Sequence, residues 1–307
     1  MGTNLDPKSK VAGHAQKGKE RRPVIMTLAP IEITAGPRVE SVEVHEHESG
    51  YSTRVDMSGE GPALVVLNGL LGLNRHWFDC LPTLEGRARC VLVEPPLLNL
   101  AGEHCSVKGV VRLVVHTLET LALGPAVLAG NSLGGHVAMR IAMSRPDLVR
   151  GLVLIGSSGL FERGFERNVM HAPSRDWLER KIADLFCDPA RMPPGMVDEA
   201  YAELSQRRHA RALVKLGKSA KNDHLGEALP SLRVPTMLLW GRQDTVTPPE
   251  VAEEFRALIP GSTLRWIDRC GHAPQIERPV EVAEALAEFL ASPGLPPGTG
   301  LSGRAQL

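Results

Sequence analysis

Short runs of apolar residues recur along the chain and alternate with segments of helical periodicity. Five of these runs are continuous, which is typical of strands buried on both faces of a parallel sheet. They are residues 63–67, 90–93, 126–129, 152–155 and 237–240. Helical patterns occupy residues 77–84, 107–123, 135–143 and 250–258, and a strand at 264–267 and a helix at 280–290 follow. The alternation predicts an α/β fold with a mostly parallel sheet and helices on both of its faces.

The first strands have a different pattern. Residues 39–48 and 51–57 alternate apolar with polar positions, and Ser49-Gly50 between them suits a hairpin turn. This hairpin makes the expected sheet mixed rather than wholly parallel. The preceding residues 1–37 are rich in Gly, Lys and Pro, so we expect them to be disordered or loosely attached, and residues 292–307 to form a flexible tail.

Strand patterns stop after about residue 158 and resume near residue 230. The stretch 159–229 is helical in pattern, with prolines between its helices. We expect residues 38–158 and 230–291 to form the α/β core and 159–229 to form a helical cap that covers a site as a lid. The alternative is a long surface excursion without function.

Composition narrows the class of protein. The 307 residues include 35 basic and 35 acidic side chains, which gives no electrostatic footprint for nucleic acid or an anionic membrane. No apolar stretch is long enough for a membrane span. The five cysteines are odd in number and lack zinc-ligand spacing, which favours free thiols in a reducing compartment. Since the N-terminus has no signal-peptide core, we expect a cytoplasmic protein.

The most informative motif is Gly130-Asn131-Ser132-Leu133-Gly134, which lies between a predicted strand and a predicted helix. A serine in such a sharp turn has neighbours two residues away that cannot carry side chains. The turn exposes the hydroxyl at the end of the sheet. We therefore predict that Ser132 is a nucleophile.

A serine hydroxyl needs a base to accept its proton. His272 follows the last predicted strand, and Asp244 follows the strand before it. Functional groups gather beyond the carboxyl ends of parallel strands, so Ser132, Asp244 and His272 are expected to meet there. Asp244 would then hold the second ring nitrogen of His272. Glu162 is a rival for the acid.

An acyl-transfer site also needs N–H donors for the developing oxyanion. The backbone N–H of Leu133, directly after the serine, is one candidate. The loop Asn68-Gly69-Leu70-Leu71-Gly72 follows the 63–67 strand, and the N–H of Leu70 is our candidate for the second donor.

These motifs together resemble the α/β-hydrolase superfamily over residues 40–291. The resemblance is carried by Asn68-Gly69-x-x-Gly72, the turn at 130–135, Gly241-Arg242-x-Asp244 with Pro248, and Gly271-His272. It implies an eight-stranded sheet, a helical cap after the sixth strand, and hydrolysis without a metal or organic cofactor. Serine at position 132 argues against the dehalogenases and epoxide hydrolases of the superfamily, which use aspartate there.

Within the superfamily the motifs look like those of carboxylesterases and of carbon–carbon hydrolases from meta-cleavage pathways. Three features depart from the expected pattern. Ala273 stands where the meta-cleavage enzymes commonly have tryptophan, Asn68 replaces a histidine, and Glu94-Pro95-Pro96-Leu97 replaces an Asp-x-Pro-Gly stretch. The first departure weakens the carbon–carbon interpretation. A cap arginine for a substrate carboxylate would be Arg207, Arg208 or Arg211, with nothing in the sequence to choose between them.

The sequence thus predicts a serine hydrolase that cleaves a small-molecule carboxylic ester. A carbon–carbon hydrolase and a non-catalytic binding protein on the same fold are the alternatives, and the oligomeric state is open, a homodimer included. The candidate substrate contacts are Gly69, Asn131, Phe161 and Trp177. Phe161 and Trp177 could equally fill the core or the cap interface, and Asn131 could orient the turn instead.

Overall fold

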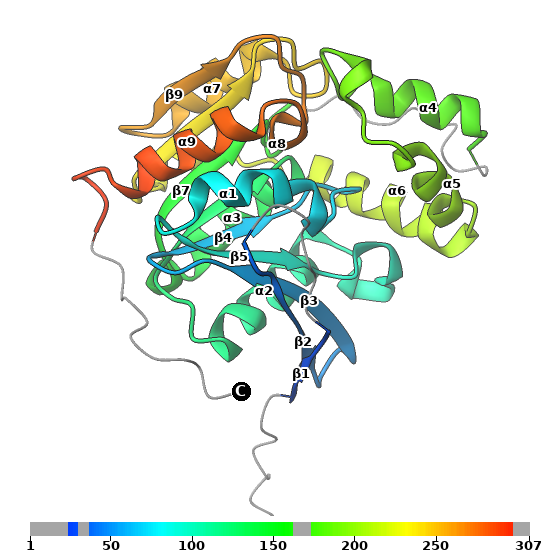
Figure 1. Cartoon of the computed structure of the whole chain (residues 1–307), viewed down its shortest axis with the longest axis horizontal. Coiled ribbons are helices and arrows are strands. Elements are labelled where there is room, and N and C mark those ends of the chain that lie inside the picture. The colour runs from blue at the N-terminus through cyan, green and yellow to red at the C-terminus, as the bar shows by residue number, and fades with distance from the viewer. Residues whose placement is uncertain (1–23, 30–36, 162–172, 297–307) are drawn as a thin grey trace, which may run out of the picture.

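The computed structural model describes residues 24–29, 37–161 and 173–296. Their strands form one nine-stranded sheet in the order β1-β2-β3-β5-β4-β6-β7-β8-β9 (Figure 1). The strands are β1 (Val24–Thr27), β2 (Glu40–Glu46), β3 (Tyr51–Ser58), β4 (Ala63–Leu67), β5 (Arg89–Glu94), β6 (Ala126–Asn131), β7 (Val149–Ile155), β8 (Thr236–Gly241) and β9 (Thr263–Ile267). From β5 across to β9 all neighbours pair in parallel, whereas β1, β2, β3 and β5 pair antiparallel. The predicted α/β fold with a mostly parallel sheet is confirmed.

The sheet has one strand more than expected. Residues 24–27, part of the segment expected to be loosely attached, form β1 and pair with β2 from Val24 opposite His45 to Thr27 opposite Val42. Three of these four residues are exposed. A short edge strand of this kind has no buried face, so its sequence carries no periodic apolar signal.

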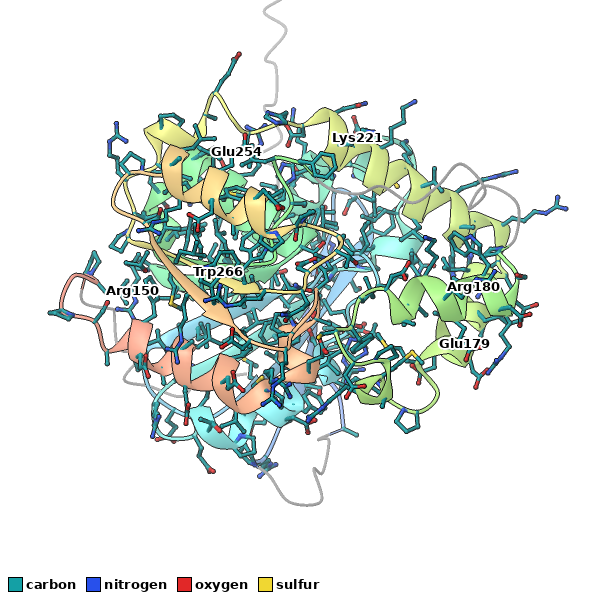
Figure 2. All side chains as sticks on the ribbon, turned by 90° about the horizontal axis from the view of Figure 1, so that it is seen from above. Arg150, Glu179, Arg180, Lys221, Glu254 and Trp266 are labelled. Atoms are coloured by element: carbon teal, nitrogen blue, oxygen red, sulfur yellow. The ribbon has the colours of Figure 1, made fainter. Side chains whose placement is uncertain are left out.

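Helices cover both faces of the sheet. The longer ones in the core are α2 (Val107–Thr120), α3 (Leu133–Ser144), α7 (Pro249–Leu258) and α9 (Pro279–Leu290). Apolar residues of α2, α3 and α7 pack in one buried cluster, and those of α1 (Leu81–Leu84) and α9 in another. Viewed from above, α7 and α9 lie on opposite sides of β9, which carries Trp266 (Figure 2). Alternate residues of each central strand feed the two clusters, as the pleat requires: Leu128 enters the first, and Val127 and Ala129 the second.

The remaining elements are short. The helix expected at 77–84 is divided into the 3-10 helix η1 (Asn74–Cys80) and α1, because Pro82 lacks the N–H that would continue the first helix and starts a new one. The others are η2 (Leu97–Asn99), η3 (Gly102–His104), η4 (Pro146–Leu148), η6 (Pro189–Arg191), η7 (Leu229–Ser231) and α8 (Pro274–Glu277).

Between β7 and β8 the described residues 173–229 contain α4 (Arg175–Ala183), α5 (Met196–Leu204) and α6 (Arg207–Asn222). We refer to residues 173–229 as the helical segment. Its three helices gather beyond one end of the sheet, at the right of Figure 1. They pack there in small apolar clusters, one of which contains Leu178, Leu204 and Leu213 together with Leu70 of the core. In the described ranges, the helices are all too short or too polar to cross a membrane.

Candidate active site

Ser132 occupies a sharp turn between the fully buried strand β6 and helix α3. Its backbone φ is 53° and ψ is −118°, a conformation that L-residues rarely adopt. The turn requires glycine on both sides. A Cβ on Gly130 would lie 2.3 Å from the nitrogen of Gly135, and a Cβ on Gly134 would lie 2.1 Å from the carbonyl oxygen of Leu67. These contacts explain the Gly-x-Ser-x-Gly spacing in atomic terms.

Backbone hydrogen bonds hold this turn against the neighbouring strand β7. The N–H of Ser132 donates to the carbonyl of Ile155 (3.0 Å), and the Ser132 carbonyl accepts from the N–H of Ser158 (3.1 Å). Because hydrogen bonds hold the strained backbone before and after the Ser132 Cα, the Ser132 side chain has a defined position at the end of the sheet.

Asp244 and His272 lie in the loops that follow β8 and β9. His272 Nδ1 is 2.8 Å from Asp244 Oδ2, and both side chains are buried. The other carboxylate oxygen, Oδ1, accepts from the backbone N–H groups of Val246 (2.8 Å) and Thr247 (2.9 Å). A carboxylate held in this way orients an imidazole and stabilises its protonated form.

The loops after β6, β7, β8 and β9 converge on one place. The Asn131 amide, next to Ser132, donates to the carbonyl of Ile155 (3.0 Å) and to that of His272 (3.1 Å). A Cβ on Gly156 would lie 3.0 Å from Asp244 Oδ2 and 3.2 Å from His272 Nδ1. Since Gly156 directly follows Ile155, the residues of the serine turn and the Asp244–His272 pair are neighbours. The Asn131 side chain is occupied by these two carbonyls and orients the loops.

The loop after β4 approaches Ser132 from the other side. Leu67 pairs with Gly130 in the β4–β6 ladder, and a Cβ on Gly69 would lie 3.2 Å from the Ser132 Cβ. Gly69 therefore allows the loop to pass close to the serine. The side chain of Asn68 is turned into a buried network, in which it accepts from Trp77 Nε1 (2.9 Å) and donates to Asn74 Oδ1 (2.9 Å). Leu70 and Leu133, the two residues whose N–H groups we expect to bind an oxyanion, both line the cavity described next.

A cavity of about 540 Å³ lies between this loop, the start of α3 and helices α4 and α5. Its walls are mainly apolar and include Leu97, Val137, Ile182, Leu185, Met196 and Ala200. Ser132, Asp244 and His272 do not line it, but Leu133 and Gly134 do. The cavity thus reaches the turn from the side of Leu133 and Leu70 rather than from the side of the histidine.

Five titratable residues also border the cavity: Arg75, His76, Glu94, Glu199 and Glu203. Arg75 forms an ion pair with Glu199 of α5, which joins the core to the helical segment. Burial, and secondarily the charge of Arg75, lowers the pKa of His76 to about 4. Burial raises the pKa of the Glu94 carboxyl. The cavity wall thus includes one guanidinium group and three carboxyl groups.

The remaining sequence candidates lie elsewhere. Phe161 is 56% exposed, and Trp177 of α4 is half-buried and packs against the cluster of Leu178, Leu204 and Leu213; neither Phe161 nor Trp177 lines the cavity. The arginines considered for a substrate carboxylate are exposed on α6 and do not line it either: Arg207, Arg208 and Arg211. Glu162, the rival acid, lies outside the described residues.

Sequence reasoning missed two residues that touch the loops of Asp244 and His272. The hydroxyl of Thr247 lies 2.9 Å from Asp244 Oδ2. The carboxylate of Glu277 accepts from the N–H of Gly271 (2.6 Å). A threonine three residues after an aspartate is a recognisable local hydrogen-bonding pattern and could have been noticed. Nothing in the sequence indicates that backbone N–H groups converge on Glu277.

Comparison with known proteins gives matches along most of the chain. Residues 64–285 match the model of the family described as "Alpha/beta hydrolase family". The chain is 25% identical over 285 residues to the monoacylglycerol lipase ABHD6 of Bos taurus, covering 84% of each chain. It is also 25% identical over 288 residues to a 2-hydroxy-6-oxononadienedioate/2-hydroxy-6-oxononatrienedioate hydrolase of a Pseudomonas species, covering 85% of this chain and 95% of that one.

A solved structure shows the same fold. It is MGS-MChE2, an alpha/beta hydrolase enzyme from the metagenome of lagoon sediments at Mar Chica, Morocco. The TM-score is 0.63 at 30% sequence identity, with 77% of this chain and 94% of that chain covered. The match of the family model over most of the chain, together with the turn at Ser132 at the end of a mostly parallel sheet, shows that this protein belongs to the alpha/beta hydrolase family.

Proposed function

We propose that the protein is a serine hydrolase that cleaves neutral carboxylic esters, with Ser132, His272 and Asp244 as its catalytic triad. The observation that carries the proposal is the 2.8 Å contact between His272 Nδ1 and Asp244 Oδ2, beside a serine held at φ 53°. A histidine oriented in this way can accept the serine proton through its other ring nitrogen.

The reaction proceeds in two steps. Ser132 Oγ attacks the ester carbonyl while His272 accepts its proton, and the N–H groups of Leu133 and Leu70 bind the oxyanion. His272 then protonates the leaving alcohol, and an acyl-enzyme remains on Ser132. In the second step His272 takes a proton from water while the water oxygen attacks the acyl carbon. The bond between the acyl carbon and Ser132 Oγ then breaks, His272 returns the proton to Ser132 Oγ, and the acid is released. The family supports hydrolysis, and the residue roles are our proposal.

The cavity favours a neutral ester over an acidic substrate. Its apolar walls suit an acyl chain, and its volume of about 540 Å³ is in the range of sites for small organic ligands. An anionic diketo acid would meet Glu199 and Glu203 at the wall, and the one bordering guanidinium, that of Arg75, is already paired with Glu199. The helical segment supplies one side of this cavity, which supports its role as a lid.

The carbon–carbon hydrolase remains the second candidate, because one of the similar proteins is named a hydrolase of 2-hydroxy-6-oxononadienedioate and 2-hydroxy-6-oxononatrienedioate. At position 273, directly after the histidine, this chain has a buried alanine packed among Ile182, Phe186 and Val197 of the helical segment. The side chain there is small and contacts the protein rather than the cavity, which gives no support to a substrate contact at this position.

The free thiols support a reducing compartment such as the cytoplasm. All five cysteines are unpaired in the structure, and four of them are buried: Cys80, Cys90, Cys105 and Cys270. Oxidising surroundings would be expected to select disulfides in an exported protein of this kind.

A fluorophosphonate probe tests the nucleophile directly. Wild-type protein should be labelled covalently, and Ser132→Ala should not. Labelling that persists in Ser132→Ala would remove Ser132 as the nucleophile, and wild-type protein without labelling would favour a non-catalytic binding protein. A panel of nitrophenyl esters compared with a coloured meta-cleavage product then separates the two hydrolase classes; faster turnover of the meta-cleavage product would overturn the ester assignment.

A further inference from the structure

Glu277 is a buried carboxylate that joins the helical segment to the His272 loop. It is 1% exposed and closes the short helix α8. Oε1 accepts from the backbone N–H groups of Cys187 (3.0 Å) and Asp188 (3.1 Å), which follow α4. Oε2 accepts from the N–H of Gly271 (2.6 Å), the residue before His272. One side chain therefore accepts hydrogen bonds from three backbone N–H groups in two separate parts of the chain.

The same stretch of the helical segment contacts both loops of the proposed triad. The N–H of His272 donates to the carbonyl of Leu185 (2.7 Å), and the hydroxyl of Thr245 donates to the carbonyl of Asp184 (3.0 Å). Gly271 packs so closely that a Cβ there would lie 2.6 Å from the Leu185 carbonyl oxygen. Residues 184–188 are thus bound directly to the backbone of His272 and to the residue after Asp244.

We propose that Glu277 is a positioning residue that fastens residues 184–188 of the helical segment to the His272 loop, so that this segment holds the catalytic histidine as well as covering the cavity. The inference deepens the proposed function and rests on it for the role of His272. Glu277 touches no reacting atom. It acts through the backbone at Gly271 and His272.

The chemistry of the site explains why a carboxylate is needed. Both oxygens of a carboxylate accept hydrogen bonds, whereas a glutamine amide has one accepting oxygen and one donating nitrogen. In Glu277→Gln the amide NH₂ must face either the N–H of Gly271 or the N–H groups of Cys187 and Asp188. On that side two donors would then face each other, and the hydrogen bond is lost. The substitution keeps the size and shape of the side chain. It therefore breaks the connection without leaving a cavity.

The test combines hydrogen exchange with the reactivity of Ser132. Peptides that cover residues 184–188 and 269–272 should exchange about tenfold faster in Glu277→Gln than in the wild type. The rate of labelling by a small fluorophosphonate, which is too short to depend on the cavity, should fall about tenfold to a hundredfold, since small misplacements of catalytic groups have effects of this size. The KM for nitrophenyl acetate should change less than kcat. Glu284→Gln, the same charge change at an exposed position of α9, is the matched control and should behave as the wild type.

The outcomes separate the two proposals. Faster exchange in both peptides with slower labelling supports the positioning role. An unchanged labelling rate overturns it, because a merely structural Glu277 would lower thermal stability without slowing the chemistry. Faster exchange at residues 269–272 alone also overturns it, because Glu277 would then not hold residues 184–188. If the wild type is not labelled at all, the proposed function fails, and exchange in the two peptides still decides whether Glu277 fastens them. Should Glu277→Gln fail to fold, Glu277→Asp, which keeps the charge but is too short to reach both sides, gives the same comparison.

Discussion

The hydroxyl of Thr247 lies 2.9 Å from Asp244 Oδ2, the same carboxylate oxygen that is 2.8 Å from His272 Nδ1. Thr247 is fully buried, and its N–H also donates to the other oxygen of Asp244 at 2.9 Å. One residue therefore supplies two of the hydrogen bonds that fix the carboxylate. The orientation of His272 depends on that fixation.

Replacing this hydroxyl tests its importance. Thr247→Val keeps the shape of the side chain but removes one donor from a buried carboxylate, which costs about 1–3 kcal/mol. We expect kcat for a nitrophenyl ester to fall about tenfold and the free energy of unfolding in urea to fall by that amount. Thr247→Ser retains the hydroxyl and should keep most of the activity. A Thr247→Val variant as active as the wild type would contradict this role for the hydroxyl.

Gly69 provides a test of the approach between the β4 loop and the serine. In Gly69→Ala the new Cβ lies 3.2 Å from the Cβ of Ser132, so one of the two must move by a few tenths of an ångström. We expect kcat/KM to fall about tenfold or more, because catalytic geometry tolerates little displacement, while the protein remains folded. Gly217→Ala on α6, where the nearest atom is 3.8 Å away, is the control and should keep full activity. Equal activity of the two variants would remove Gly69 from the site.

The half-buried His76 predicts a loss of stability in mild acid. Its pKa is lowered from 6.5 to about 4, so between these values the unfolded chain binds a proton that the folded protein does not. The free energy of unfolding should therefore decrease as the pH falls below 6.5, by about 2 kcal/mol at pH 5. Burial raises the pKa of Glu94, so the folded protein binds a proton there more readily than the unfolded chain does. Protonation of Glu94 therefore increases the free energy of unfolding as the pH falls, which opposes the effect of His76.

A comparison with His76→Asn isolates the contribution of the histidine. The N–H of Leu73 donates to His76 Nδ1 (3.2 Å), and an asparagine oxygen can accept the same hydrogen bond without titrating. Urea unfolding at pH 7 and pH 5 should show the smaller loss in His76→Asn. The same loss in both proteins would assign the acid sensitivity to other groups.

Cys187 is the cysteine that a thiol reagent should reach first. It is partly exposed, whereas the other four are buried, and burial raises the pKa of Cys90 to about 12 and raises those of Cys80 and Cys270. At pH 8 the folded protein should react rapidly with one equivalent of a disulfide reagent, and Cys187→Ser should abolish this phase. Rapid reaction of several thiols would show that the core opens more readily than its packing indicates.

The sequence alone was enough to predict the parts of the molecule that follow a repeated local pattern. Ser132, Asp244 and His272 each follow an apolar strand, and parallel strands bring such positions to one edge of a sheet, so their loops could be predicted to meet. The continuous strand at 63–67 was predicted at its observed bounds for the same reason. Strand β1 has no buried face and could not be found in this way.

The substrate contacts depend on information that no local pattern carries. Trp177 was a candidate because it is aromatic and lies in the helical segment, but which side of α4 borders the cavity is decided by how three helices pack. The cavity instead borders Ile182 and Leu185 of the same region. Glu277 and Gly271 are close in sequence, but their contact matters because the N–H groups of residues 187 and 188 bind the same carboxylate from 90 and 89 positions earlier in the chain.

The pairing of Leu67 with Gly130 affects which mutations this enzyme can accept while its substrate preference evolves. The distance between the loop at Gly69 and the turn at Ser132 is set by a ladder of backbone hydrogen bonds, which side-chain substitutions do not remove. Mutations in the parts of α4 and α5 that line the cavity can therefore accumulate without moving the loop at Gly69 away from the turn at Ser132. New substrate preferences should be attainable by varying those two helices, provided that the junction at residues 184–188 is kept intact.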